Sequence, residues 1–149
     1  MHTVTKITNV DISVFDEIYE GDKTRISTAI GYDDIDHLKT YFTGEDPYLF
    51  QAVDSSNQVV AYIMGQSMGQ GVIRIVNMIT RTAGTIPDFV EPSAILLKSL
   101  GFKEVHFCVK VNGTSYVFCK NNLNRNDIYQ YIGETIPYEE YTDIKLLLV

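Results

Sequence analysis

The spacing of apolar residues along the first third of the chain predicts one strand followed by two helices. Residues 2–10 carry isolated aliphatic side chains among polar ones, which predicts a strand. A helical period begins after Asp11, a residue type that commonly caps helix N-termini. Residues 21–32 show no clear period and are predicted to form a loop, and residues 33–42 to form a second, short helix. The apolar stripe of the first helix consists of Val14, Phe15, Ile18 and Tyr19.

The middle of the chain is predicted to form three strands and a helix. Residues 48–54 and 59–64 are rich in strand-forming residues, and the short polar stretch between them predicts a hairpin turn. After a glycine-rich interval, residues 72–80 form the third predicted strand. Residues 87–100 have the apolar spacing of a helix. Gly101 follows at the position where helices often end in a left-handed residue.

An Asn-Gly pair at residues 112–113 separates two further runs of strand-like sequence. Such a pair is a strong hairpin signal, because both turn residues must adopt positive φ. We therefore predict a hairpin between residues 105–111 and 114–119. Its expected cross-strand pairs are Phe107 with Phe118 and Val109 with Tyr116.

Three elements are predicted after this hairpin. Residues 122–132 have the spacing of a short helix, and residues 135–141 and 143–149 that of two closing strands. The expected order is β-α-α-β-β-β-α-β(β)-α-β-β, which predicts a single α/β domain over residues 1–149. Its sheet should be mixed but mostly antiparallel, with helices on both faces.

Composition and charge narrow the choice of partners. The 149 residues are 45% apolar and 21% charged, as in a soluble globular domain. The net charge is −7, and the first 54 residues hold the whole excess, with eleven acids and four bases. The sequence pI of about 4.8 argues against nucleic-acid binding, which needs a clustered cationic surface. No apolar run has the length of a membrane span, so no membrane association is expected.

The two cysteines, Cys108 and Cys119, are too few for a disulfide framework, so a reducing, cytoplasmic setting is expected. His106 alternates with Cys108 along one predicted strand. Two ligand-type residues without a third partner indicate a packed strand face, and no metal is expected.

Residues 76–86 read Val-Asn-Met-Ile-Thr-Arg-Thr-Ala-Gly-Thr-Ile, a strand followed by Arg-x-x-Gly before a predicted helix. This stretch and the element order of nearly the whole chain resemble the GNAT superfamily of acyl-CoA-dependent N-acyltransferases. The resemblance implies that Met78 contacts the pantetheine arm of acetyl-CoA through its backbone. Amides that open a helix point at anions, so the loop is implied to hold the pyrophosphate. Ile86 stands where the family has Gly or Ala, and Pro87 removes the next amide. The loop residues are Arg81, Thr82, Ala83, Gly84 and Thr85.

Residues 122–133 are similar to a second pattern of this family, Asn-x-x-Ala-x-x-x-Tyr-x-x-x-Gly, with Arg125 replacing the small residue. This resemblance implies that Asn122 contacts the cofactor and that Tyr129 protonates the departing CoA thiolate. An alternative alignment starts at Asn112 and places Cys119 at the acid position. We prefer the alignment from Asn122, because both Tyr and Gly match and two strands still follow.

Many members of the family place a glutamate on the strand before the loop, as a base for the incoming amine. Here that strand carries Arg74 and Asn77, and no acid occurs between Asp54 and Asp88. The sequence therefore contains no candidate for this base.

Two functions follow from the resemblance. The first is transfer of an acetyl group from acetyl-CoA to a cationic amine, because the acidic N-terminal segment would form the acceptor wall. The second is a catalytically silent GNAT-fold protein, such as a phage virion component, that binds a basic protein surface in an oligomer or viral assembly. Ile86, Pro87 and the missing base favour the second function, and its setting would be the virion rather than the cytoplasm.

Overall fold

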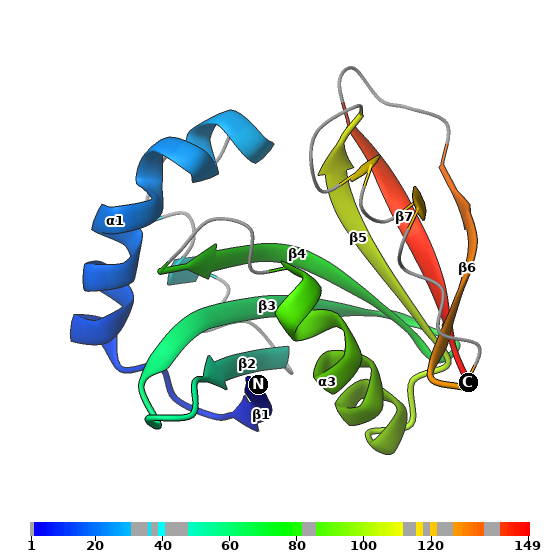
Figure 1. The fold of residues 1–149 in the computed structure, drawn as a ribbon, viewed down its shortest axis with the longest axis horizontal. Helices are drawn as coiled ribbons and strands as arrows, with labels where there is room; N and C mark the ends of the chain where they lie inside the picture. Colours follow the sequence, from blue (N-terminus) through cyan, green and yellow to red (C-terminus); the bar gives the residue numbers. More distant parts are fainter. Residues whose placement is uncertain are drawn as a thin grey trace.

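A seven-stranded sheet forms the centre of the molecule in the computed structural model (Figure 1). The structure describes residues 2–30, 36, 39–40, 48–81, 86–111, 116–117, 120–121, 127–135 and 141–149. The spatial order of the strands is β1-β2-β3-β4-β5-β7-β6. Strands β4 and β5 pair in parallel, and the other neighbouring pairs are antiparallel. The predicted mixed, mostly antiparallel α/β sheet is therefore confirmed. The strands are β1 (Thr3–Ile7), β2 (Tyr48–Val53), β3 (Val59–Gly69), β4 (Val72–Thr80), β5 (Glu104–Lys110), β6 (Tyr129–Glu134) and β7 (Tyr141–Leu148).

Two helices, α1 (Ile12–Ile30) and α3 (Ile86–Ser99), cover opposite faces of the sheet. On one face, Phe15 of α1 packs in a buried cluster with Tyr62 of β3. On the other, Phe89 of α3 belongs to the main core cluster, which also contains Ile63, the next residue of β3. Successive strand residues point to opposite faces, so this alternation places the helices on the two sides. None of the helices in the described ranges is both long enough and apolar enough to span a membrane.

The start of α1 and the end of α3 follow the predictions. The Asp11 carboxylate accepts hydrogen bonds from the backbone N–H groups of Ser13 (3.1 Å) and Val14 (3.3 Å), which confirms Asp11 as the N-cap. After α3, Gly101 has a φ of +96°, and the Phe102 N–H donates to the Leu97 carbonyl. Gly101 therefore ends α3 as predicted, in the conformation that glycine adopts without a steric penalty.

The predicted loop at residues 21–32 is wrong over most of its length, because α1 continues to Ile30. A single glycine inside a helix is unfavourable by only about 1 kcal/mol, so Gly21 does not end it. Most of the predicted helix at residues 33–42 lies outside the described residues. Within this range, Asp36 and Lys39 are described and are helical.

Strand β3 is longer than predicted. It continues beyond Met64 to Gly69, and the chain then reverses into β4. Residues 69–71 all have positive φ, which includes the non-glycine residue Gln70 at +55°. Residues 69–71 therefore form a tight turn at the end of a long strand. The sequence predicted a longer glycine-rich interval between the two strands.

The predicted hairpin between residues 105–111 and 114–119 is wrong. The Asn-Gly pair lies outside the described residues, but Tyr116 and Val117 are helical. The antiparallel partner of β5 is β7, with Phe107 opposite Ile144 and Val109 opposite Thr142. Every second residue of β7 is buried, from Thr142 to Leu148, so this strand offers β5 a continuous buried face. A second correction concerns residues 122–132, since residues 129–134 form β6 rather than part of a helix. The first predicted closing strand, residues 135–141, lies mostly outside the described residues. The second, residues 143–149, is confirmed by β7.

Candidate functional site

Strands β4 and β5 are hydrogen-bonded along one part of their length and separate along the rest. Residues 72–75 pair with residues 104–107, and the described remainder of each strand does not pair with the other. Figure 1 shows the two strands meeting near one end and diverging toward the other. We use the name cleft for this separation of the two strand backbones beyond Ile75 and Phe107.

A β-bulge lies where the cleft begins. Along β3, Gly65 pairs with Ile75 and Met64 pairs with Asn77, so Val76 is left over on β4. A bulge bends its strand and increases the local twist. The bulge therefore accounts for β4 leaving β5 immediately after Ile75.

The Asn77 side chain of β4 lies beyond the last residue that pairs with β5. Asn77 is only 3% exposed, and its side-chain Oδ1 accepts the N–H of Met78 at 2.7 Å. Its Nδ2 is buried without a hydrogen-bond partner in the described structure. A buried donor without an acceptor is unfavourable by about 1–3 kcal/mol and is rare in proteins. Among the described residues, the Asn77 Nδ2 is therefore a buried donor whose hydrogen bond is not made.

A cavity of about 100 Å³ lies between α3 and the sheet, on the face of the cleft opposite Asn77. Its wall is almost entirely apolar, and Ser93 supplies the polar side chain. Both edges of the cleft contribute to it, β4 through Ile75 and Met78 and β5 through Phe107. The cavity is therefore continuous with the place where the strands separate.

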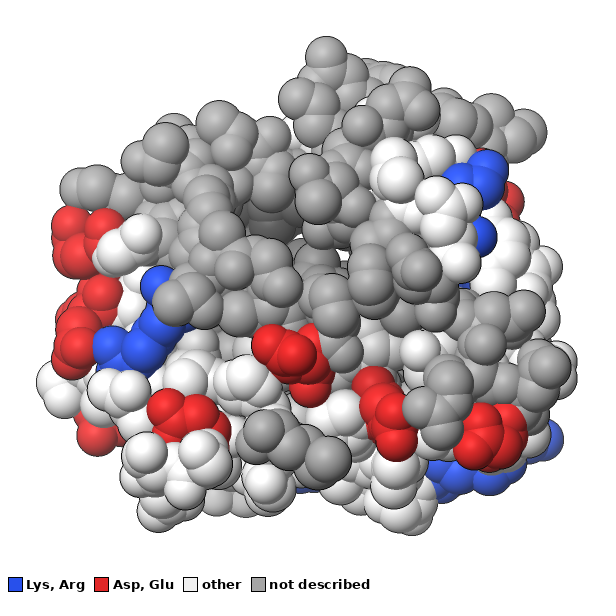
Figure 2. Space-filling view, viewed as in Figure 1, with Lys and Arg blue, Asp and Glu red and all other residues white. Residues whose placement is uncertain are grey.

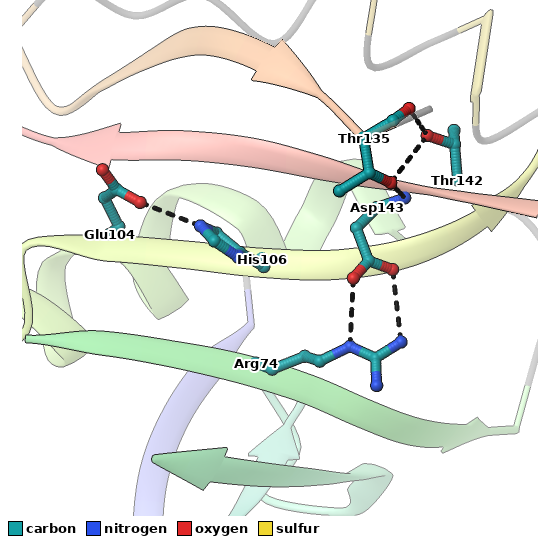
Figure 3. A network of polar contacts seen from close by, with 6 residues as sticks. All are labelled: Arg74, Glu104, His106, Thr135, Thr142 and Asp143. Atoms are coloured by element: carbon teal, nitrogen blue, oxygen red, sulfur yellow. Dashed lines mark hydrogen bonds and ion pairs between the residues drawn. The ribbon is translucent and has the colours of Figure 1, made fainter. Parts of the chain in front are cut away.

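On the α1 face, a polar network ties β4 to β7 across β5 (Figure 3). The Arg74 guanidinium donates to both carboxylate oxygens of Asp143, at 3.1 and 3.3 Å. The Asp143 N–H donates in turn to the Thr135 hydroxyl, and the Thr142 hydroxyl donates to the Thr135 carbonyl. Arg74 lies one residue before the last paired rung of β4, so the network fixes the base of the cleft.

The predicted strand face of His106 and Cys108 is part of this polar surface. The His106 ring contacts Glu104 at 2.8 Å. Burial raises the pKa of the Cys108 thiol, and the nearby Asp143 carboxylate raises it further. Cys108 is therefore a thiol rather than a reactive thiolate at neutral pH. No group of three or more metal-binding side chains occurs in the part of the chain that the structure describes.

The structure gives Arg81 partners within the protein. Its Nε donates to the Val59 carbonyl at 2.6 Å, and its Nη1 lies 2.6 Å from the Glu17 carboxylate. Its backbone N–H donates to the Val60 carbonyl. The guanidinium and the amide that the resemblance assigned to a pyrophosphate thus hold α1 and β3 in this structure. The other loop residues and Asn122 lie outside the described residues, namely Thr82, Ala83, Gly84 and Thr85.

Tyr129 lies far along the sheet from the cleft. It is 5% exposed and pairs with Leu148, near the end where β4 and β5 are still joined. The helix expected to present it is a strand. The structure therefore does not bring Tyr129 together with Met78, while Cys119 of the alternative alignment lies outside the described residues.

A tyrosine that the sequence did not single out lies closer to the cleft. The Tyr116 hydroxyl donates to Glu134 at 3.0 Å and lies 3.1 Å from the Lys120 ammonium. Glu134 pairs with Ile144, which pairs with Phe107, so this group lies level with the start of the cleft. The spacing of four residues between Tyr116 and Lys120 is that of helix neighbours. The hairpin prediction obscured this signal.

Acidic side chains gather along the described part of α1. Figure 2 shows acidic side chains along the edge of the molecule where α1 lies in Figure 1. Two of these carboxylates have cationic partners, Asp16 with Lys39 at 3.0 Å and Glu17 with Arg81. Glu17 nevertheless keeps 65% of its side chain exposed, so the surface of α1 remains acidic.

No protein-family model matches the chain. No curated protein matches it in sequence.

Solved structures do match its fold. The ribosomal-protein-S18-alanine N-acetyltransferase from Escherichia coli is 13% identical, with a TM-score of 0.62 over 99% of this chain and 93% of that one. The GNAT domain of S. lividans PAT is 10% identical, with a TM-score of 0.66 over 97% of this chain and 89% of that one. A spermidine N-acetyltransferase from Vibrio cholerae, in complex with CoA and spermine, is 10% identical. Its TM-score is 0.62 over 99% of this chain and 94% of that one. The chain therefore has the GNAT fold, as its sequence predicts. Identities this low establish the fold alone.

Proposed function

We propose that this chain is an acyl-CoA-dependent N-acyltransferase, with acetyl-CoA as its simplest donor and a cationic amine as its acceptor. The observation that carries the proposal is the separation of β4 from β5, where the buried Asn77 amide lacks a partner on one face of the sheet and an apolar cavity lies on the other. The pantetheine arm of CoA contains amide carbonyls that would accept from the Asn77 Nδ2. A GNAT-fold structure that holds CoA and spermine supports the same class of ligands.

In the proposed reaction, the amine nitrogen attacks the thioester carbonyl, the carbon–sulfur bond breaks, and the CoA thiolate leaves. The cationic amine first loses one proton to solvent, because only the neutral amine is a nucleophile. It loses a second proton as the amide forms, and the thiolate gains one from the proton donor, which solvent or the departing amine proton restores, so protons balance. We assign the proton donor to Tyr116, because its hydroxyl lies level with the start of the cleft. The Lys120 ammonium at 3.1 Å would stabilise the phenolate that forms.

The acceptor is proposed to be cationic because of the charge on α1. The first 54 residues carry a net charge of −7, and the exposed carboxylates of α1 lie on the face opposite the cavity. A surface of one sign raises the local concentration of ligands of the other sign. A polyamine or a lysine side chain fits this surface.

A second function, binding without turnover, is favoured by one observation. Arg81 uses both its side chain and its amide inside the protein, and β4 carries no carboxylate that could serve as a base. In this case the acidic α1 face would bind a basic protein surface.

Calorimetric titration with acetyl-CoA distinguishes the two functions. We expect micromolar binding that Asn77→Leu weakens about fivefold, since a hydrogen bond between neutral groups contributes about 1 kcal/mol. Gln66→Leu, which changes an exposed amide on β3, is the matched control and should leave binding unchanged. Absence of heat at millimolar acetyl-CoA would contradict the enzyme and favour binding without turnover.

Turnover of the Tyr116→Phe variant tests the assigned proton donor. We expect a lower kcat with little change in CoA affinity, because the hydroxyl acts on the leaving group. Tyr129→Phe serves as control, since Tyr129 is buried far from the cleft, and equal effects of both substitutions would refute the assignment.

A further inference from the structure

We propose that the donor preferred by this chain carries an aliphatic acyl group longer than acetyl, which occupies the cavity beneath α3. This inference rests on the proposed function and specifies its donor. A volume of about 100 Å³ holds roughly four carbon atoms, because an apolar cavity of about 150 Å³ binds the six carbons of benzene. Butanoyl to hexanoyl groups match this size.

The sequence of α3 explains why the cavity exists. Two small residues, Ser93 and Ala94, follow one another on the side of α3 that lines the cavity. The sheet residues across from them include Ile75 and Phe107. Protein interiors rarely contain voids larger than a water molecule, so a gap of this size inside the main core is unusual. Larger residues at two adjacent positions of α3 would fill it.

The chemistry of the wall restricts what can occupy the cavity. A buried water needs about two to four polar partners, and the described lining offers the single hydroxyl of Ser93. Charged groups would be buried there without a counter-charge. An aliphatic chain suits the wall, and its contacts with the apolar lining replace contacts with water.

The Ser93 hydroxyl itself indicates a ligand. Its Oγ is buried and has no hydrogen-bond partner in the structure as described. An acyl chain has one polar group, its carbonyl, and the cavity has one free donor. We infer that the carbonyl oxygen accepts from Ser93 when the acyl group is bound.

The cavity and the separation of the strands have residues in common. Ile75 and Met78 of β4 and Phe107 of β5 line the cavity and also flank the point where the strands separate. A thioester held in the cleft therefore has its acyl chain at the mouth of the cavity.

Calorimetry with CoA, acetyl-CoA, butanoyl-CoA and hexanoyl-CoA tests the proposal on the full chain. Each buried methylene group strengthens binding about fourfold, so butanoyl-CoA should bind roughly fifteen times more tightly than acetyl-CoA. Ala94→Phe fills the cavity and should abolish this difference while leaving CoA affinity unchanged. Ile95→Phe changes the neighbouring residue, which is 55% exposed, and should preserve it.

The outcomes separate the two proposals. Absence of binding for every CoA compound would overturn the proposed function. Tight binding of CoA with equal affinity for acetyl-CoA and butanoyl-CoA would overturn the inference and leave the function standing. Should Ala94→Phe not fold, Ser93→Val is the second variant. It removes the hydroxyl and narrows the cavity, and an unchanged preference for butanoyl-CoA in this variant would also overturn the inference.

Discussion

Substitution of Arg81 by methionine tests whether this residue holds α1 or binds phosphate. In the structure, the guanidinium lies between the Val59 carbonyl and the Glu17 carboxylate, both at 2.6 Å. Arg81→Met keeps most of the apolar stem and removes both contacts. We expect the free energy of unfolding to fall by about 2 kcal/mol, while affinity for acetyl-CoA stays within a factor of two or so.

The magnitude comes from two unequal contacts. A hydrogen bond from a charged donor contributes about 1.5–3 kcal/mol, and the substitution leaves the Val59 carbonyl without this donor. The ion pair with Glu17 contributes at most about 0.5 kcal/mol, because the Glu17 side chain is 65% exposed and screened by water. The carbonyl contact therefore accounts for most of the expected loss.

Urea unfolding of the wild type, Arg81→Met and Glu17→Gln measures the two contacts separately. In urea, Glu17→Gln should lower the free energy of unfolding by no more than about 0.5 kcal/mol. In thermal unfolding, Arg81→Met should lower Tm by about 4–8 °C. The reasoning would be refuted by unchanged stability of Arg81→Met together with tenfold weaker binding of acetyl-CoA. That result would place the guanidinium at the pyrophosphate, as the family resemblance implies.

Three further substitutions give separate tests. Ser93→Ala should raise the free energy of unfolding by about 1 kcal/mol, because it removes an unpaired buried hydroxyl and improves helix propensity. Lower stability of this variant in urea would show that the hydroxyl is paired. Hydrogen bonds from Ser13 and Val14 lower the pKa of Asp11, so its cap stabilises α1 above the unfolded pKa and is lost as the pH falls through the folded pKa. The difference in Tm between wild type and Asp11→Ala, measured by circular dichroism, should therefore shrink from about pH 5 downward, and a constant difference would contradict this. Because burial raises the pKa of Cys108, iodoacetamide should modify it slowly at pH 8, as followed by peptide mass spectrometry, and rapid modification would show an accessible thiolate.

The elements that the sequence predicted well have local signals. Strand β4 has a run of β-branched residues, and the helix α3 has an apolar stripe closed by Gly101. The pairing of β5 with β7 has no local signal, because the two strands are separated by about thirty residues of sequence. The Asn-Gly pair gave a strong local signal for a different partner. Long-range burial of Ile144 against Phe107 decided the outcome.

The error at β6 has a different cause. Ile128, Tyr129 and Ile132 have helical spacing, whereas Tyr129 and Tyr131 alternate as in a strand. A segment this short fits both periods, and pairing with β7 selects the strand. The role that the resemblance assigned to Tyr129 depended on the helix, so the same ambiguity affected the prediction of the site.

Met78 lies beyond the last pair between β4 and β5, and its contact with the pantetheine arm stays a prediction. Asn77 received no role, since its exposure to a ligand depends on the bulge at Val76 and on the departure of β5. Both features depend on how β4 pairs with its two neighbours, β3 and β5, in the folded sheet. No spacing within residues 72–80 indicates them.

Two buried polar groups on opposite sides of the cleft bear on the choice between enzyme and silent binding protein. Asn77 Nδ2 and Ser93 Oγ both lack partners in the described structure. At about 1–3 kcal/mol each, they remove a sizeable part of the 5–15 kcal/mol that stabilises an ordinary domain. A protein that binds its partner through α1 gains nothing from them, and apolar residues at both positions would make it more stable. The proposed acyl-CoA would offer each group an acceptor. The unpaired groups are therefore better explained by a ligand between β4 and β5 than by an interaction confined to the acidic face.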